Sequence, residues 1–223
     1  MHGRDFVAAV SGGVAKGLRL AYCPDIAGVG VDPHIEAVCW RAALGLTQLA
    51  ATVEEVSLDL AFGRDAFLAL RGHWFVSWMF ERLHRIEKFG VNVRNNTNAG
   101  LTADTRGLGA AEHARGRMWH LFREFFGKFD HLLTPTMAVP PFPVEQNYPQ
   151  TVAGKVMKTY VDWIAPTFIL SLTGLPVASV PCGKDPEGMP VGLQIVGQPR
   201  GEEAVLALAA AVQKLNPVGL PPL

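Results

Sequence analysis

Two short segments of the sequence carry residues that could perform nucleophilic chemistry. In the run SGGVAKG, Ser11 precedes two glycines and Lys16 follows five positions later. A serine activated by a lysine can attack a carbonyl carbon, and glycine-rich backbone can supply amide donors for the resulting oxyanion. The second candidate is Cys182, a thiol at the end of a hydrophobic run. No histidine follows Cys182 in the sequence, so a buried, unreactive thiol is favoured there.

The other catalytic patterns that we sought do not occur. Lys16 precedes Gly17, which reverses the Gly-Lys-Ser/Thr order of a phosphate-binding loop. The sequence has no HExxH, no GxSxG, no EF-hand loop and no CxxC pair. We therefore expect neither a metal nor a cofactor.

The composition indicates a globular chain that is short of charge. Its 20 Lys and Arg balance its 20 Asp and Glu, so net charge gives no reason to expect nucleic acid or an anionic membrane as a partner. Apolar residues reach 49%, which suffices for a core and excludes disorder. Charged residues reach only 18%, below the roughly 25% of soluble domains, and mean hydropathy is +0.18.

The sequence favours a reduced, cytoplasmic protein. Its three cysteines are widely separated, and the N-terminal apolar stretch is too interrupted for a signal peptide. The uncharged stretch from Trp163 to Gly183 is long enough to span a bilayer. Its Pro166, Gly174 and Pro176 instead favour a buried helix, a turn and a buried strand.

The first secondary-structure element that the sequence predicts is a strand over Leu18 to Tyr22. Asp32 and Pro33 then predict a capped helix, and Thr52 to Leu58 alternates as a second strand. The helix presents one apolar face, made of Ile35, Val38, Cys39, Ala42, Leu46, Leu49 and Ala50. Strand, helix and strand form a βαβ crossover, so part of the sheet should be parallel.

The rest of the chain alternates between helix and strand patterns. We expect helices over 62–89, 105–128, 151–172 and 202–214, strands over 129–134, 176–182 and 191–196, and a loop over 91–100. An apolar stripe in the 62–89 helix predicts core, with an aromatic ligand pocket as the alternative. Its members are Phe67, Leu70, Trp74, Trp78 and Ile86. The predicted fold class is α/β, with a mixed, partly parallel β-sheet flanked by helices.

Two long motifs in the last third are the most specific feature of the sequence. FDHLLTPTMAVPPFPV is followed by LTGLPVASVPCGKDPEGMPVGLQIVGQP, and KGLRLAYCPDIAGVGVDPHIEAV stands near the start. These segments resemble the C-terminal part of the amidase-signature family, serine hydrolases of carboxamides, from about Lys16 to Val212. The resemblance implies an incomplete amidase-signature fold. Residues 1–223 would form a single incomplete domain, with 1–16 as a linker and 217–223 as a tail.

The resemblance also implies that no catalytic residue lies in this chain. The family's two serines and lysine belong to its first half, so this part alone would be inactive. As a relic of that half, Ser11 with Lys16 fits poorly, because the family's serines are adjacent and flanked on both sides by glycines. We expect poor solubility, self-association as a homo-oligomer, or binding to a separate chain that carries the N-terminal half.

The second half of the family lines the substrate pocket. By position, the resemblance implies four substrate-binding residues, Tyr160, Asp162, Trp163 and Thr136. The alternative is structural, with Trp163 in the core, Asp162 capping or salt-bridging locally and Tyr160 packing.

The complete enzyme would hydrolyse a small carboxamide to carboxylate and ammonia through an acyl-serine. One alternative is a fragment like the glutamyl-tRNA amidotransferase A subunit, which places an acid ten positions before the TGLP glycine. Here Ile164 stands at that position, and Asp162 stands twelve before Gly174, as in stand-alone amidases. Ser171, where those enzymes commonly have Asn, departs from the pattern. Further alternatives are a non-catalytic descendant that binds an amide-like ligand or a protein, and a truncation product without function.

Overall fold

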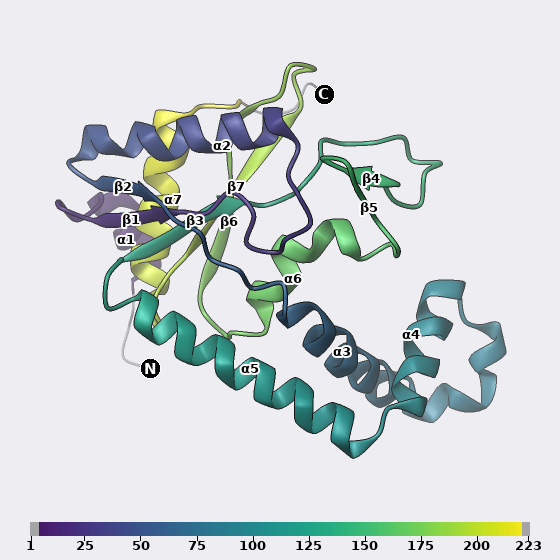
Figure 1. The fold of residues 1–223 in the computed structure, drawn as a ribbon. Helices are drawn as coiled ribbons and strands as arrows, with labels where there is room; N and C mark the ends of the chain where they lie inside the picture. The colour runs from purple at the N-terminus through teal and green to yellow at the C-terminus, as the bar shows by residue number, and fades with distance from the viewer. Residues whose placement is uncertain (1–4, 220–223) are drawn as a thin grey trace.

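A computed structural model describes residues 5–219 of the protein as a central β-sheet with helices on both faces (Figure 1). The five-stranded sheet has the order β2-β1-β3-β7-β6. Its strands are β1 (Arg19–Tyr22), β2 (Thr52–Glu55), β3 (His131–Pro135), β6 (Val177–Lys184) and β7 (Pro190–Val196). β1 is parallel to β2 and β3, and β7 is antiparallel to β3 and β6. The predicted mixed, partly parallel sheet is confirmed.

The first βαβ unit forms as its capping residues predict. Helix α2 (Pro33–Gly45) begins after Asp32, whose side chain accepts hydrogen bonds from the backbone N–H groups of His34 and Ile35. A 3-10 turn, η1 (Leu46–Leu49), leads into β2. β1 and β2 pair in parallel, with Leu20 opposite Val53, so the crossover is confirmed.

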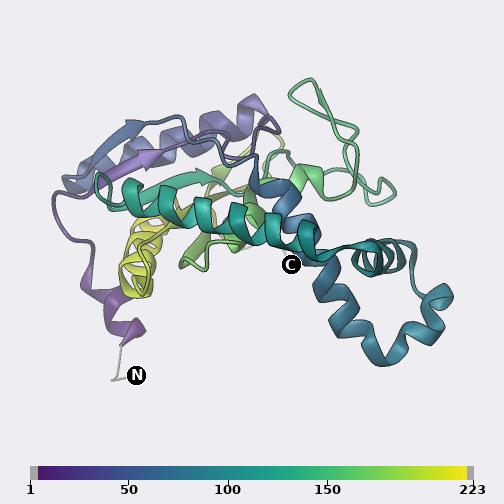
Figure 2. The same cartoon turned by 60° about the horizontal axis from the view of Figure 1, so that its bottom comes forward.

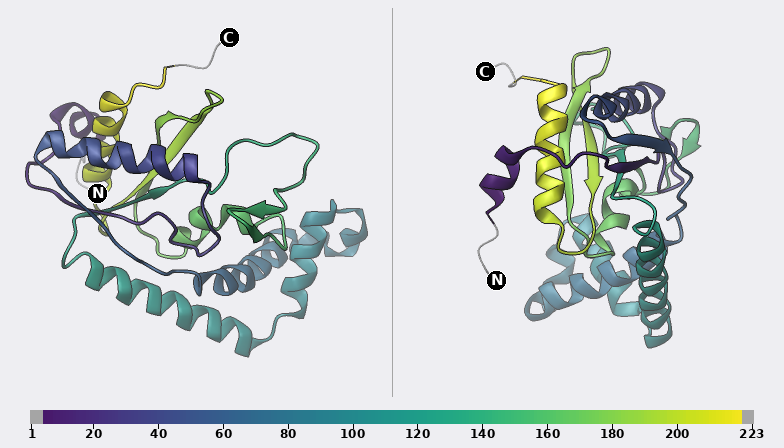
Figure 3. Two further views of the ribbon diagram at one scale, coloured as in Figure 1. Left: turned by 45° about the horizontal axis from the view of Figure 1, so that its top comes forward. Right: turned by 90° about the vertical axis from the view of Figure 1, so that its left-hand side faces the viewer.

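Helices cover both faces of the sheet (Figures 2 and 3). Helices α2 and α7 (Glu202–Leu215) share one core with Leu20 and Tyr22 of β1, and α1 (Phe6–Gly12) packs against α7. Ala21, between those two β1 residues, belongs to the other core, under α3 (Gly63–Met79), α5 (Thr105–Phe125) and α6 (Ala165–Ser171). Alternation along β1 therefore contributes to both cores.

An arm of helices projects from the body of the protein (Figures 1 and 2). Helix α3 continues through η2 (Phe80–Lys88) and returns as α4 (Val91–Thr102), so the predicted loop over 91–100 is wrong. The run VNVRNNTNAG has no apolar period, and its helix is stabilised by packing on α3. Phe67 and Leu70 are buried core, as predicted, but Trp74 and Trp78 of the same stripe are 37% and 67% exposed, so the core prediction is wrong for them.

The predicted helix over 151–172 is also wrong for most of its length. Residues 151–156 form a hairpin of β4 (Thr151–Val152) and β5 (Lys155–Val156), and α6 occupies only the last part. The turn residues Ala153 and Gly154 both have positive φ, which a helix does not permit. η3 (Asp162–Ile164) precedes α6, which begins with Pro166 in its first turn. Within residues 5–219, no helix is long and apolar enough to cross a membrane.

Strands β2 and β6 are the outer strands of the sheet as described. Along β6, Val180 and Cys182 are buried in the core shared with α2, whereas Val177 and Ser179 are exposed on the opposite face. The described residues therefore leave one face of β6 uncovered and its outer edge open to a further strand.

The crossing of α3 and α4 depends on two glycines. A Cβ atom on Gly72 would lie 2.9 Å from the backbone nitrogen of Gly100, and a Cβ atom on Gly100 would collide with the Gly72 carbonyl. We predict that Gly100→Ala lowers the free energy of unfolding by about 1–3 kcal/mol, although alanine gains about 1 kcal/mol in helix propensity. Urea unfolding followed by circular dichroism measures the change.

The matched control is Gly109→Ala in α5, where an added Cβ meets no atom within 4 Å. This variant should gain about 0.5–1 kcal/mol from helix propensity alone. Equal stabilisation by both substitutions would show that the two helices do not require the close contact.

Candidate ligand pocket beyond strand β3

A small pocket lies beyond the carboxyl end of β3, where α/β sheets commonly bind ligands. Its volume is about 240 Å³. The residues that line it are Ile35, Thr136, Met137, Val139, Pro140, Pro141, Phe142, Trp163, Pro190, Val191 and Gly192. The structure thus brings two of the four predicted substrate-binding residues, Thr136 and Trp163, into one pocket.

Thr136 is held by the two strands beside it. Its backbone N–H donates to the carbonyl of Gly192 at 2.9 Å, and its hydroxyl shares a 2.8 Å hydrogen bond with the hydroxyl of Ser179 on β6. A Cβ atom on Gly192 would lie 2.8 Å from Oγ1 of Thr136. Glycine at 192 therefore leaves the room that this threonine occupies.

Trp163 on η3 forms the aromatic wall of the pocket. Its ring meets that of Phe142 edge to face, with the centroids 5.1 Å apart and the planes at 83°. Its Nε1 atom is buried without a hydrogen-bond partner. Because this nitrogen is shielded from the surface, the indole presents carbon atoms to the pocket.

Asp162 has a different role in the geometry. Its carboxylate accepts hydrogen bonds from Nε and Nη2 of Arg64 at 2.9 and 2.6 Å, and from the backbone N–H groups of Lys158 and Thr159 at 2.8 Å each. Burial alone would raise the pKa of Asp162, but these hydrogen bonds and the Arg64 charge outweigh it and hold the pKa below its ordinary value. The carboxylate is neutralised and saturated, which fits the structural alternative for this residue.

Tyr160 also faces the α3–α4 arm. Its hydroxyl accepts hydrogen bonds from Nη2 of Arg71 at 3.2 Å and from Nδ2 of Asn96 at 2.7 Å. The guanidinium of Arg71 lies 4.9 Å from the centroid of the Phe75 ring, which fixes its position further. Tyr160 and Asp162 thus anchor the segment that carries Trp163 to α3 and α4.

The two nucleophile candidates do not contribute to the pocket. Ser11 lies on α1, and its hydroxyl donates to the carbonyl of Val7 at 3.0 Å. Cys182 is 2% exposed, and its sulfur lies 3.9 Å from that of Cys39. The hydrogen bond with Cys182 and burial raise the pKa of the Cys39 thiol. Within residues 5–219, no group of three or more His, Cys, Asp or Glu side chains is placed to hold a metal.

Sequence reasoning missed Arg64, Phe142 and Ser179. Arg64 is 98 positions from Asp162, so no local pattern could pair them. Ser179 stands between the apolar residues Ala178 and Val180 in a predicted strand. That alternation could have assigned Ser179 to the opposite face, although not to Thr136.

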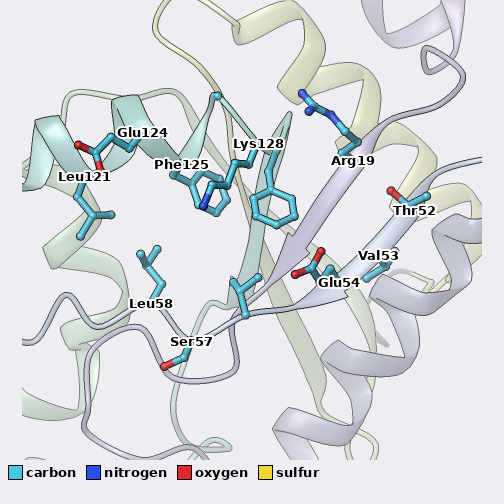
Figure 4. A pocket seen from close by; sticks show the side chains of 13 residues that line it. Arg19, Thr52, Val53, Glu54, Ser57, Leu58, Leu121, Glu124, Phe125 and Lys128 are labelled. Atoms are coloured by element: carbon cyan, nitrogen blue, oxygen red, sulfur yellow. The ribbon is translucent and has the colours of Figure 1, made fainter.

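A larger hollow of about 1200 Å³ lies between β2 and the end of α5 (Figure 4). Figure 4 shows Arg19 of β1, Glu54 of β2 and Lys128 beyond α5 around a wide opening, with Leu58 and Phe125 among its apolar residues. None of the predicted substrate-binding residues lines it. We therefore assign the candidate site to the smaller pocket beyond β3.

The fold and the pocket define an α/β protein with a pocket beyond the carboxyl end of β3. A model of the Amidase family matches residues 4–206, so the chain belongs to the amidase family. It is 28% identical over 222 residues to an acylamidase of Rhodococcus erythropolis, covering 95% of this chain and 45% of that protein. It is 30% identical over 236 residues to the A subunit of the glutamyl-tRNA(Gln) amidotransferase of Myxococcus xanthus, covering 94% of this chain and 47% of that protein.

The fold is shared with a bacterial aryl acylamidase of the amidase signature family, whose crystal structure matches with a TM-score of 0.84 at 24% identity. The match covers 95% of this chain and 46% of that one. The chain thus spans about half the length of the relatives that it matches. The predicted family is confirmed.

The buried carboxylate gives a pH-dependent prediction. Asp162→Ala should lower the free energy of unfolding by about 2–4 kcal/mol at neutral pH, because it leaves Arg64 and two backbone donors without their acceptor. The folded pKa of Asp162 lies below the unfolded value of about 3.9. Its stabilisation is therefore present above that value and is lost as pH falls through the folded pKa. Urea unfolding at neutral and acid pH should show the difference shrinking below about pH 4.

Asp65→Ala is the matched control. Asp65 contacts Nη1 of the same Arg64 at 3.2 Å, but its side chain is 90% exposed. Solvent screens such a pair, so the change should be small at either pH. A similar loss in both variants would contradict a special role for Asp162.

Proposed function

We propose that this chain forms the substrate-binding half of an amidase that hydrolyses a small carboxamide to carboxylate and ammonia through an acyl-serine. Family membership supports the reaction class, and the pocket that joins Thr136 to Trp163 supports the role of this part. The serine nucleophiles and the lysine would come from polypeptide outside these 223 residues. That polypeptide would be either an earlier part of a longer chain or a separate protein.

The proposed division of labour follows from what amide hydrolysis requires. The reaction needs an activated nucleophile, a proton carrier for the leaving amine and donors for the oxyanion. Apolar walls and the hydroxyl of Thr136 can instead orient the acyl group and exclude water. The described pocket therefore suits binding rather than attack.

The catalytic half would dock along the uncovered side of β6. Val177, 38% exposed, and Ser179 lie on that side, and the hydroxyl of Ser179 contacts Thr136 at the pocket. A polypeptide packed there would adjoin the pocket and could extend the sheet at its outer strand. A second copy of this chain on the same edge would give an inactive homo-oligomer.

A second candidate is a part of a glutamyl-tRNA amidotransferase A subunit, favoured by the 30% identity to the Myxococcus xanthus protein. Asp162 argues against it, because its carboxylate already accepts four hydrogen bonds and is not available to a substrate ammonium group. We therefore prefer the amidase.

Reconstitution tests the proposal. The nucleotides upstream of the Met1 codon, and neighbouring reading frames, should encode a Gly/Ser-rich segment with paired serines and a lysine. When that polypeptide is produced separately and mixed with this chain, amide hydrolysis should appear that neither part shows alone. Ammonia release measures the activity, and a fluorophosphonate probe should label a serine of the added part only.

One variant serves as a control, and a second tests the docking side. Ser11→Ala should leave the reconstituted activity unchanged, because the Ser11 hydroxyl is bonded within α1. Ser179→Pro, which alters β6 beside the pocket, should abolish or strongly reduce it. Hydrolysis by this chain alone, with probe labelling that Ser11→Ala removes, would refute the proposal.

A further inference from the structure

We propose that the pocket beyond β3 takes an uncharged, compact acyl group, such as an aromatic ring or a branched alkyl chain, and rejects acyl groups that carry an ammonium or a carboxylate. This inference rests on the proposed function in treating the bound group as the acyl part of the substrate. The residues that line the pocket indicate the substrate class.

The absence of charged side chains in the pocket lining is the first evidence for this preference. All eleven lining residues are uncharged, although they come from α2, η3, β7 and the loop after β3. Two acids adjoin lining residues along the chain, and neither lines the pocket. Asp162, beside Trp163, is neutralised by Arg64, and Glu36, beside Ile35, is exposed to solvent. An ionised ligand would lose water in this pocket without gaining an opposite charge, which is unfavourable.

The volume indicates how large a group the described residues can hold. A cavity of about 150 Å³ accommodates benzene, whereas pockets for larger ligands span roughly 300–1,000 Å³. At about 240 Å³, this pocket has room for one ring and an attached carboxamide. A long alkyl chain or a peptide would extend beyond it.

The walls suit a flat or branched apolar group. The perpendicular rings of Phe142 and Trp163 offer both an edge and a face to an aromatic ligand. Pro140, Pro141 and Pro190 restrict the backbone around them, so little ordering is needed when a ligand binds.

Among the residues that line the pocket, Thr136 is the one with a hydroxyl. Nε1 of Trp163 is buried and has no hydrogen-bond partner in the described residues. Thr136 and Ser179 share one hydrogen bond, in which either hydroxyl is the donor. When Ser179 is the donor, Thr136 keeps its own proton and can donate it to a carboxamide oxygen. One neutral amide on an apolar body matches this arrangement.

Ligand binding to the full chain tests the inference. Saturation-transfer NMR should show saturable binding of benzamide and cyclohexanecarboxamide. Benzamidine has the shape of benzamide but carries a positive charge, and glutamine carries both charges. Each of these should bind about tenfold more weakly than benzamide or worse.

Variants link the selectivity to the pocket. Trp163→Ala should weaken benzamide binding by about tenfold, whereas Trp119→Ala, a half-exposed tryptophan on α5 outside the pocket, should leave it unchanged. Met137 lies at the rim and is 37% exposed, so Met137→Asp should fold normally. That variant should favour benzamidine over benzamide, which keeps the test valid even if Trp163→Ala fails to fold.

Three results would overturn the inference. They are benzamidine or glutamine binding as tightly as benzamide, no saturable binding of either neutral amide, and a Met137→Asp variant with unchanged preference. Reconstituted enzyme that hydrolyses charged amides faster than neutral ones would refute this inference alone. Selective binding of neutral amides without any reconstituted hydrolysis would instead refute the proposed function alone.

Discussion

The partly buried ion pair between Asp162 and Arg64 is the interaction on which the rest of the site depends. It joins η3 to α3, and the same carboxylate accepts the backbone N–H groups of Lys158 and Thr159. The segment before α6 is thereby fixed in a stretch with little regular structure. Trp163 is the next residue, so its place in the pocket follows from this anchor. Because the pair is internally neutral, it positions the aromatic wall without adding charge to the pocket.

The second constraint is the incomplete covering of apolar surface. Charged residues make up only 18% of the sequence. The structure shows which apolar side chains are exposed in their place. Trp78 and Phe80 on the arm are 67% and 70% exposed, and Val177 is exposed on the bare face of β6. Exposed apolar side chains that cluster can mark a surface that binds another polypeptide. The chain spans about half the length of its relatives. Substrate binding and association with another polypeptide would then use adjoining surfaces.

The pocket beyond β3 is built from rigid parts. Prolines, the glycine beneath Thr136 and the paired aromatic rings set the pocket shape before any ligand arrives. Amide hydrolysis gains from such preorganisation, because an acyl group held in one orientation presents its carbonyl carbon to a nucleophile supplied from elsewhere. Under the proposed function, this chain would contribute to the rate without supplying the nucleophile.

Local signals in the sequence determined much of the sheet. Asp32 and Pro33 start α2 through contacts with adjacent residues, and alternation identified β2, so the parallel β1–β2 pair followed from the sequence. The tertiary structure alone decided the helix at 91–102, which depends on Gly100 meeting Gly72, and the pairing of Asp162 with Arg64. It also decided that Thr136 and Trp163 share a pocket while Tyr160 faces the arm. Caps and alternation act between near neighbours, whereas these contacts join residues far apart in the chain and exist only once the elements have packed.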